Sequence, residues 1–116
     1  MMTETEAVDY LEMRAARHGM TYHDLMEVTP GPVADSPQEA AAFWEMKHIS
    51  HIEPQSTHPH LASDSSNVIP EDPTPNLERG AETMTDDEIL IAQLDNYVDA
   101  VMIDLTSTTD TSLVFI

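Results

Sequence analysis

The sequence TDDEILIAQLDNYVDAVMIDL spans residues 85–105 and carries the clearest helical pattern of this 116-residue chain. Its apolar residues recur at alternating spacings of three and four, which is the a/d repeat of a helix with one apolar face. The residues at these spacings are Ile91, Leu94, Val98, Val101 and Leu105, flanked by Leu90, Tyr97 and Met102. We expect an amphipathic helix here, and we name this set of residues the apolar seam.

The start of this helix is marked by local chemistry. Thr85 stands three residues before Glu88, the spacing of a capping box in which each side chain accepts from the other residue's backbone N–H. Asp86 and Asp87 lie in the first turn, where the helix dipole favours negative charge. The sequence therefore predicts a helix that begins next to Thr85.

The part of the chain before residue 54 is predicted to form a small helical lobe, residues 1–53. Three helices are expected over about residues 4–18, 22–28 and 37–50, and the caps are Thr3 with Glu6, Thr21 with Asp24, and Ser36 with Glu39. Gly19 is a typical helix stop, and so is the Pro-Gly-Pro run at residues 30–32. Phe43 and Trp44 are the largest apolar residues of the lobe and are expected to anchor its core.

Residues 54–84 have a different composition, without a helix or strand period. Five prolines interrupt the segment, at positions 54, 59, 70, 73 and 75. Such a composition is typical of an extended, Pro/Ser-rich arm. Its scattered apolar residues suggest an arm that lies in the groove of a partner; they are Leu61, Val68, Ile69 and Leu77.

The last residues combine a polar tether, 106–112, with the apolar sequence LVFI at 113–116. An apolar carboxyl end is unusual, because chain ends are normally polar and frayed. Either this tail folds back onto the seam helix, or it adds a short strand to a neighbour's sheet. The fold class predicted is therefore mostly α: a helical lobe, an extended arm, an amphipathic helix over 85–105 and an apolar tail.

The charge of the chain restricts its partners. It has 22 acidic residues against 4 Lys and Arg, a net charge of −18, so neither nucleic acid nor an anionic membrane is an expected partner. The acids are spread along the chain and Lys47 is the single lysine, a composition that resembles the proteins of extreme halophiles. A DNA mimic is the competing interpretation; it would group its acids on regular faces. In strong salt, self-repulsion of the chain is screened.

Motifs for chemistry are sparse. The chain has no cysteine, no phosphate-binding glycine loop and no nucleophile motif, so we expect no enzyme activity, no cofactor and no metal site. Histidines 48, 51, 58 and 60 are close in sequence, but their spacing matches no established metal site. A helix-turn-helix at residues 15–25 is rejected, because its second helix carries acids instead of basic residues. Asp95 and Asp99 are expected to form a solvated acidic pair on the outer side of the seam helix.

No secretory signal or membrane span is expected from the sequence, since the acidic amino end lacks an apolar stretch and no apolar run is long enough. The function predicted is a non-enzymatic assembly subunit that stabilises a multi-subunit particle in high salt, such as a virion capsid, neck or tail component. The alternatives are an acidic DNA-mimic inhibitor and a histidine-based metal-binding module. The expected partners are other protein subunits or copies of this chain. The predicted partner-binding residues are Leu90, Ile91, Leu94, Tyr97, Val98, Val101, Leu105, Leu113, Val114, Phe115 and Ile116.

Overall fold

A computed structural model describes residues 2–108 of the chain, which form a mostly helical structure with one small sheet. The helices are α1 (Glu4–Ala16), α2 (Tyr22–Glu27), α3 (Gly31–Ala34), α4 (Pro37–Glu45), α5 (Pro73–Arg79) and α6 (Asp86–Thr108). The strands are β1 (His48–His51) and β2 (Val68–Glu71), and two short 3-10 turns, η1 (Pro59–Leu61) and η2 (Ser65–Asn67), lie between them. The prediction of a mostly α fold is confirmed. Within residues 2–108, no helix has both the length and the apolar character of a membrane span.

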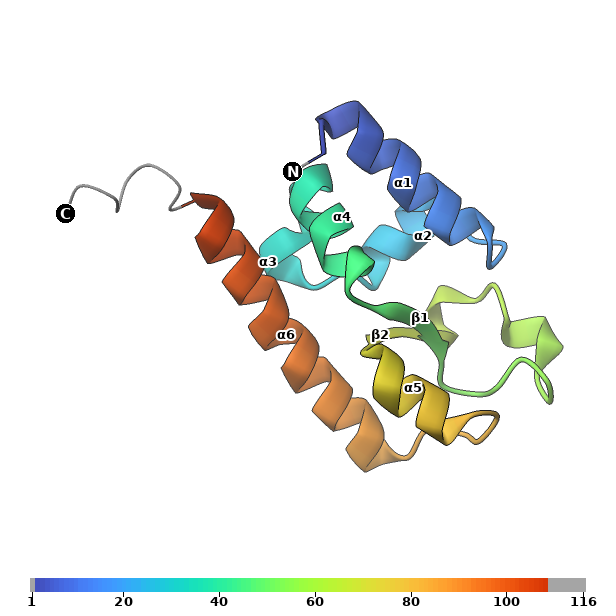
Figure 1. Ribbon diagram of the computed structural model, residues 1–116. Helices are drawn as coiled ribbons and strands as arrows, with labels where there is room; N and C mark the ends of the chain where they lie inside the picture. The colour runs from blue at the N-terminus through green and yellow to red at the C-terminus, as the bar shows by residue number, and fades with distance from the viewer. Residues whose placement is uncertain (1, 109–116) are drawn as a thin grey trace.

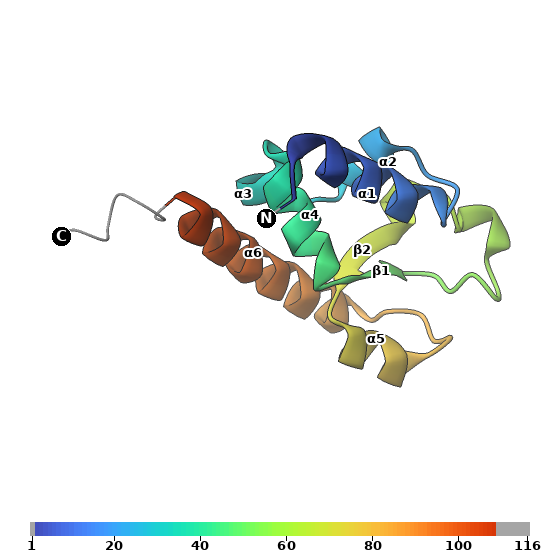
Figure 2. The same cartoon turned by 45° about the horizontal axis from the view of Figure 1, so that its top comes forward.

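The two strands lie between two groups of helices. Helices α1 to α4 gather on one side of the sheet and α5 lies on the other (Figure 1 and Figure 2). Helix α6 runs along one edge of this body, where it contacts α3, α4 and β2. Elements that are far apart in the sequence therefore hold α6 in place.

The predicted starts of α1, α2, α4 and α6 are confirmed. Each start depends on a side chain that caps residues close to it in the sequence. Thr85 Oγ1 accepts from the backbone N–H of Glu88 at 3.2 Å, and Glu88 Oε1 accepts from the N–H of Thr85 at 2.9 Å. The same reciprocal pair occurs at the starts of α1 and α2, and Ser36 caps α4. Gly19 has a φ of 72°, the left-handed conformation expected just after a helix.

Helix α4 ends earlier than the expected residue 50. Arg14 of α1 donates to the carbonyl oxygens of Trp44 at 2.7 Å and Lys47 at 2.8 Å, so a neighbouring helix satisfies carbonyls at this end. Residues 48–51 then form β1, which pairs antiparallel with β2. The prediction failed here because the stop signal comes from a residue about thirty positions away.

The prediction of an extended arm over residues 54–84 is wrong for much of this segment. Val68 and Ile69 are buried in strand β2, and Pro70 lies opposite Ile49 in the ladder. A two-stranded sheet leaves one edge of each strand unpaired, so a proline without an N–H is tolerated there. Pro73 occupies the first turn of α5, where proline is favoured. Pro70 and Pro73 therefore occupy positions that a strand and a helix tolerate. The prolines nevertheless interrupt the sequence pattern from which these elements could have been predicted.

The core is anchored as predicted by Phe43 and Trp44, which are fully buried and meet edge to face with ring centroids 5.6 Å apart. The indole Nε1 of Trp44 donates to Thr29 Oγ1 at 3.0 Å, so its polar atom is satisfied. Val68 of β2 and Ala100 of α6 belong to the same cluster. The helical lobe, the proline-rich segment and the seam helix thus share one core.

Helix α6 continues to Thr108, so residues 106–108 of the expected polar tether are helical. Thr106 Oγ1 donates back to the carbonyl oxygen of Met102 at 2.7 Å, as threonine does on a helix surface. The apolar tail predicted to bind a partner, Leu113, Val114, Phe115 and Ile116, lies outside the described residues.

Candidate protein–protein interface

The face of α6 that points to the rest of the molecule is small and polar. Ala92 and Ala100 are buried, and their short side chains let α6 lie close to its neighbours. Asn96 is 4% exposed, and its Nδ2 donates to the carbonyl oxygen of Pro70 at 2.7 Å. Ile89 and Ile103 add partly buried contacts near the two ends of the helix. The inner face is thus attached by close approach and hydrogen bonding more than by bulky apolar packing.

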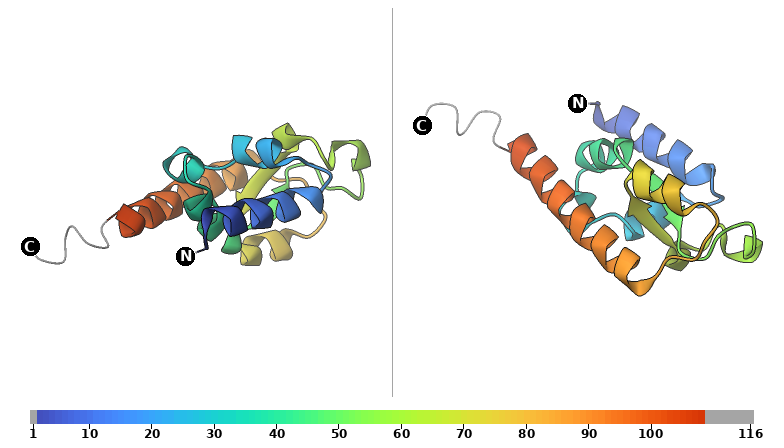
Figure 3. Two further views of the ribbon diagram at one scale, coloured as in Figure 1. Left: turned by 90° about the horizontal axis from the view of Figure 1, so that it is seen from above. Right: turned by 60° about the horizontal axis from the view of Figure 1, so that its bottom comes forward.

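The apolar seam lies on the opposite face and is open. Its members are between 51% exposed, at Leu105, and 66% exposed, at Ile91, apart from Val101, which is partly buried. The exposed members are Leu90, Ile91, Leu94, Tyr97, Val98, Met102 and Leu105. Helix α6 forms one edge of the molecule, and no other element of residues 2–108 lies on its outer side (Figure 1 and Figure 3, right). The structure thus brings the α6 members of the predicted partner-binding set together on one surface.

Beside the carboxyl half of the seam, the surface is hollowed between α4 and α6. This groove has a volume of about 560 Å³, and much of its lining is apolar. Its apolar residues are Ala42, Met46, Met102 and Ile103. Met46 is 46% exposed, so the accessible apolar surface extends from α6 onto α4. The seam is therefore part of a wider apolar face and not a single row of side chains.

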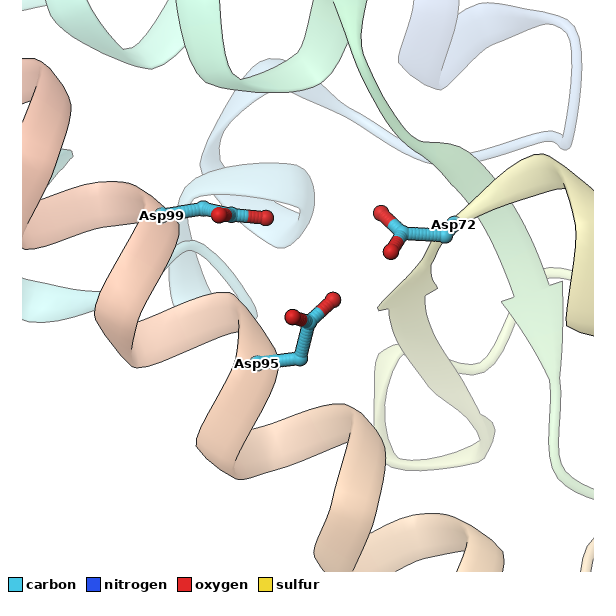
Figure 4. A group of neighbouring side chains, drawn as sticks. All are labelled: Asp72, Asp95 and Asp99. Atoms are coloured by element: carbon cyan, nitrogen blue, oxygen red, sulfur yellow. The ribbon is translucent and has the colours of Figure 1, made fainter.

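A buried lysine explains why the polar side of α6 faces inward. The side chain of Lys47 is 0% exposed, and its Nζ donates to Asp72 at 2.6 Å and to Asp99 at 2.7 Å. Asp95 lies slightly farther away, at 3.3 Å. The three carboxylates converge from α6 and from the start of α5 (Figure 4). We name these four residues the Lys47 cluster. The prediction that Asp95 and Asp99 form a solvated outer pair is wrong in part: their side chains are 46% and 34% exposed, but both accept from Lys47.

The charges in the Lys47 cluster shift one another's protonation. Burial acts to lower the pKa of Lys47, but the hydrogen bonds that Lys47 donates to Asp72 and Asp99 outweigh it and hold that pKa above its usual value. Burial acts to raise the pKa of Asp72, and the bond from Lys47 instead brings it below the usual value. A hydrogen bond with Asp72, aided by burial, raises the pKa of Asp95. Asp95 therefore takes up a proton before Asp72 on acidification.

The same aspartates have the spacing of a cation site, since one oxygen from each lies within 4.8 Å of the others. Carboxylate oxygens are suitable ligands for hard divalent cations. The ammonium of Lys47 already bonds to all three residues, however, so the protein supplies its own cation. The cluster is an internal ion-pair network that connects α6 and the start of α5 to the turn after α4.

The four clustered histidines do not converge as ligands within residues 2–108. His48 Nδ1 pairs with the Asn76 amide at 2.9 Å, and His51 Nε2 lies 2.8 Å from the carbonyl oxygen of Ala62. His58 lies 3.3 Å from a carboxylate oxygen of Glu53. These contacts give His48, His51 and His58 structural partners, and the ring of His60 lies 6.0 Å from that of His58.

Two arginines are also used inside the fold. Arg79 and Glu71 form a pair whose side chains are 4% and 5% exposed, with Nη1 donating to Oε2 at 2.8 Å. The bond to Glu71 raises the pKa of Arg79, although burial acts in the opposite direction. Arg14 bonds to Tyr10 at 2.6 Å as well as to the end of α4. Three of the four Lys and Arg residues are thus internal ties, and sequence reasoning missed all three. The available signal was their rarity: in so acidic a chain, most of the few cations serve the fold.

Comparison of the chain with models of protein families, with curated proteins and with solved structures gives no match. A functional proposal therefore depends on the geometry of α6 and its surroundings.

Proposed function

We propose that this protein is a non-enzymatic assembly subunit that attaches to other protein subunits through the apolar seam of α6. The observation that supports the proposal is the exposure of a continuous apolar face on a helix whose opposite face is already packed. Single exposed apolar residues are common on protein surfaces and require no partner. The seam is different, because it follows one helix from Leu90 to Leu105, a rise of about 22 Å.

The energetic argument follows from the seam's area. Seven large side chains that are each about half to two-thirds exposed present roughly 700 Å² of surface, above the 300–600 Å² of the largest patch on a typical monomer. Apolar area removed from water contributes about 25 cal/mol per Å² before the entropic cost of association. The gain from covering the seam is therefore large enough to support a specific complex.

The expected setting is a particle assembled in strong salt, of which a virion capsid, neck or tail is an example. Support comes from the net charge of −18 and from the use of three of the four cations inside the fold. Acidic subunits repel one another at low salt, whereas at about 1 M salt the screening length is roughly 3 Å. Salt also strengthens apolar contacts when its ions are excluded from the protein surface.

An acidic inhibitor that mimics DNA would be expected to present rows of carboxylates on its exposed helix face. On α6 the exposed face is apolar, and Asp95 and Asp99 are directed to Lys47. This arrangement favours the assembly role over charge mimicry for α6.

The test uses the full chain, tagged and expressed in its source cells, with particles separated by sedimentation. We expect the wild type to travel with a large particle and the double variant Leu94→Ser/Val98→Ser to stay in the slow fraction. The matched control is Leu77→Ser, which removes a leucine that is 71% exposed on α5, away from the seam. Equal sedimentation of the seam variant and the wild type would contradict the proposal.

A further inference from the structure

We propose that the occupant of the apolar seam is helix α6 of a second copy of this chain, packed antiparallel about a twofold axis near Tyr97 and Val98. This inference rests on the proposed function, because it names the partner at the same surface. The first support is the spacing of the seam. Alternating steps of three and four fit a helix that supercoils with another helix, while strands and irregular loops do not match this repeat.

The second support is the state of the acids that flank the seam. In a helix pair, charged residues at the flanking positions select the partner. Glu88 accepts from the N–H of Thr85 and lies 3.5 Å from Arg79. Asp95 is bonded to Lys47. Each of these flanking acids is thus already engaged within its own subunit.

Asp104, on the opposite flank of the seam, is engaged as well. A hydrogen bond with Asp104, after burial, raises the pKa of Glu39 on α4. Beyond the first turn of α6, a basic partner helix would therefore find the acids that flank the seam already bonded. An uncharged apolar partner needs no ion pairs with α6. The seam of a second copy of this chain is such a partner.

The third support is area. Roughly 700 Å² of seam surface is close to the 800 Å² that each partner contributes to a standard stable interface. Two seams that cover each other would account for nearly all of the exposed apolar surface on both helices. The neighbouring groove at Met46 and Met102 provides space for side chains from the second copy.

The direction of packing follows from the charges at the ends of α6. Asp86, Asp87 and Glu88 make the amino end acidic. Parallel packing would place two such ends side by side, whereas antiparallel packing separates them by the length of the seam. Antiparallel packing also aligns the helix dipoles favourably. The midpoint between Leu90 and Leu105 falls at Tyr97 and Val98, which places the twofold axis there.

Cysteine cross-linking tests both the partner and the direction, because the native chain has no cysteine. The full-length variants Ile91→Cys, Val98→Cys and Leu105→Cys are treated with a short bis-maleimide in multimolar KCl. We expect Val98→Cys to cross-link with itself and an equimolar mixture of the I91C and L105C variants to form a mixed dimer. Separate I91C or L105C samples should stay monomeric on denaturing gels, since their thiols lie about 20 Å apart in the antiparallel pair. Leu77→Cys is the control, and it should not cross-link.

Two results would overturn the inference. Efficient cross-linking of the I91C variant with itself would show parallel packing. The absence of cross-links in all samples, together with a monomeric mass of the untreated wild type, would exclude a second copy as the occupant. In that case the particle sedimentation experiment still decides whether the seam binds another subunit. All substituted positions are exposed, so circular dichroism should report unchanged helix content for each variant.

Discussion

The two faces of α6 differ in the opposite sense from an ordinary surface helix. A helix on a globular protein usually turns its bulky apolar residues to the core and its charges to water. Here the inner face carries Ala92, Asn96 and Ala100, and two partly exposed aspartates at its edge bond to Lys47, whereas the outer face carries the apolar seam. The difference teaches that a polar tie can hold a helix to its own subunit while its apolar side is left for another.

The Lys47 cluster should be the most sensitive part of this arrangement. In Lys47→Met three carboxylates lose their shared cation, and we expect a loss of about 3 kcal/mol in the free energy of unfolding. This is the low end of the range for broken buried pairs, because the aspartates are 34% to 46% exposed and partly solvated. Urea unfolding in strong salt measures it.

Arg17→Met is the control for this variant, since it removes the same charge from an exposed position. It should change the unfolding free energy by less than about 0.5 kcal/mol. Similar losses in K47M and R17M would mean that net charge, and not the cluster, sets the stability.

Enlarging a residue on each face should separate the two roles of α6. Ala100 is fully buried, so Ala100→Leu should overpack the inner face and cost about 2 kcal/mol. Val98→Leu adds volume to a side chain that is 57% exposed and should leave the subunit's stability nearly unchanged. Thermal unfolding at low protein concentration measures both variants. Equal losses in A100L and V98L would remove the distinction between the faces.

Removing the cap perturbs α6 without touching either face. Thr85→Ala deletes the side chain that accepts from Glu88, and we expect a loss of about 1 kcal/mol in the unfolding free energy. Thr83→Ala is the matched control, because the Thr83 hydroxyl makes an exposed contact of 3.5 Å with Glu53. The T85A variant should keep its ability to associate, since the seam is intact. Denaturant unfolding and sedimentation of the same sample check the two properties.

The smallest effect concerns pH. Burial, followed by the hydrogen bond with Asp104, raises the pKa of Glu39 in the fold above its unfolded value. The protonated form therefore stabilises the fold, and this contribution is present below the unfolded pKa and is lost as pH rises through the folded pKa. Glu39→Gln should reduce the loss of unfolding free energy that accompanies rising pH. At neutral pH the E39Q variant should therefore be as stable as the wild type or slightly more stable. Unfolding curves across pH 4 to 8 would show it, with Glu45→Gln as an exposed control. A steeper decline in E39Q would contradict this account.

Features that depend on nearby residues could be predicted from the sequence. The capping boxes at Thr3, Thr21 and Thr85 and the stop at Gly19 need only their neighbours along the chain. The spacing of the seam was also evident, since it repeats along one helix. Which side of α6 is buried could not be predicted, because the deciding contacts join Lys47 to residues 48 and 52 positions away.

The prediction of an extended arm over residues 54–84 failed for a similar reason. Its order comes from the pairing of Val68–Glu71 with His48–His51 and from the pair of Arg79 with Glu71. Neither contact leaves a periodic pattern, and prolines at a sheet edge and a helix start resemble those of an extended arm. Tertiary pairing therefore ordered a segment whose composition predicted none.

In this account α6 holds to its own subunit by one face and binds a second copy by the other. The native mass of the purified full chain in multimolar KCl tests this arrangement most directly. Sedimentation equilibrium should give a concentration-dependent dimer for the wild type and for Leu77→Ser. Leu94→Ser/Val98→Ser should give a monomer with the same helix content by circular dichroism. A seam variant that loses its helix content would show that the outer face stabilises the subunit itself, and a seam variant with the wild-type dimer mass would show that association uses another surface. Either result would contradict the account.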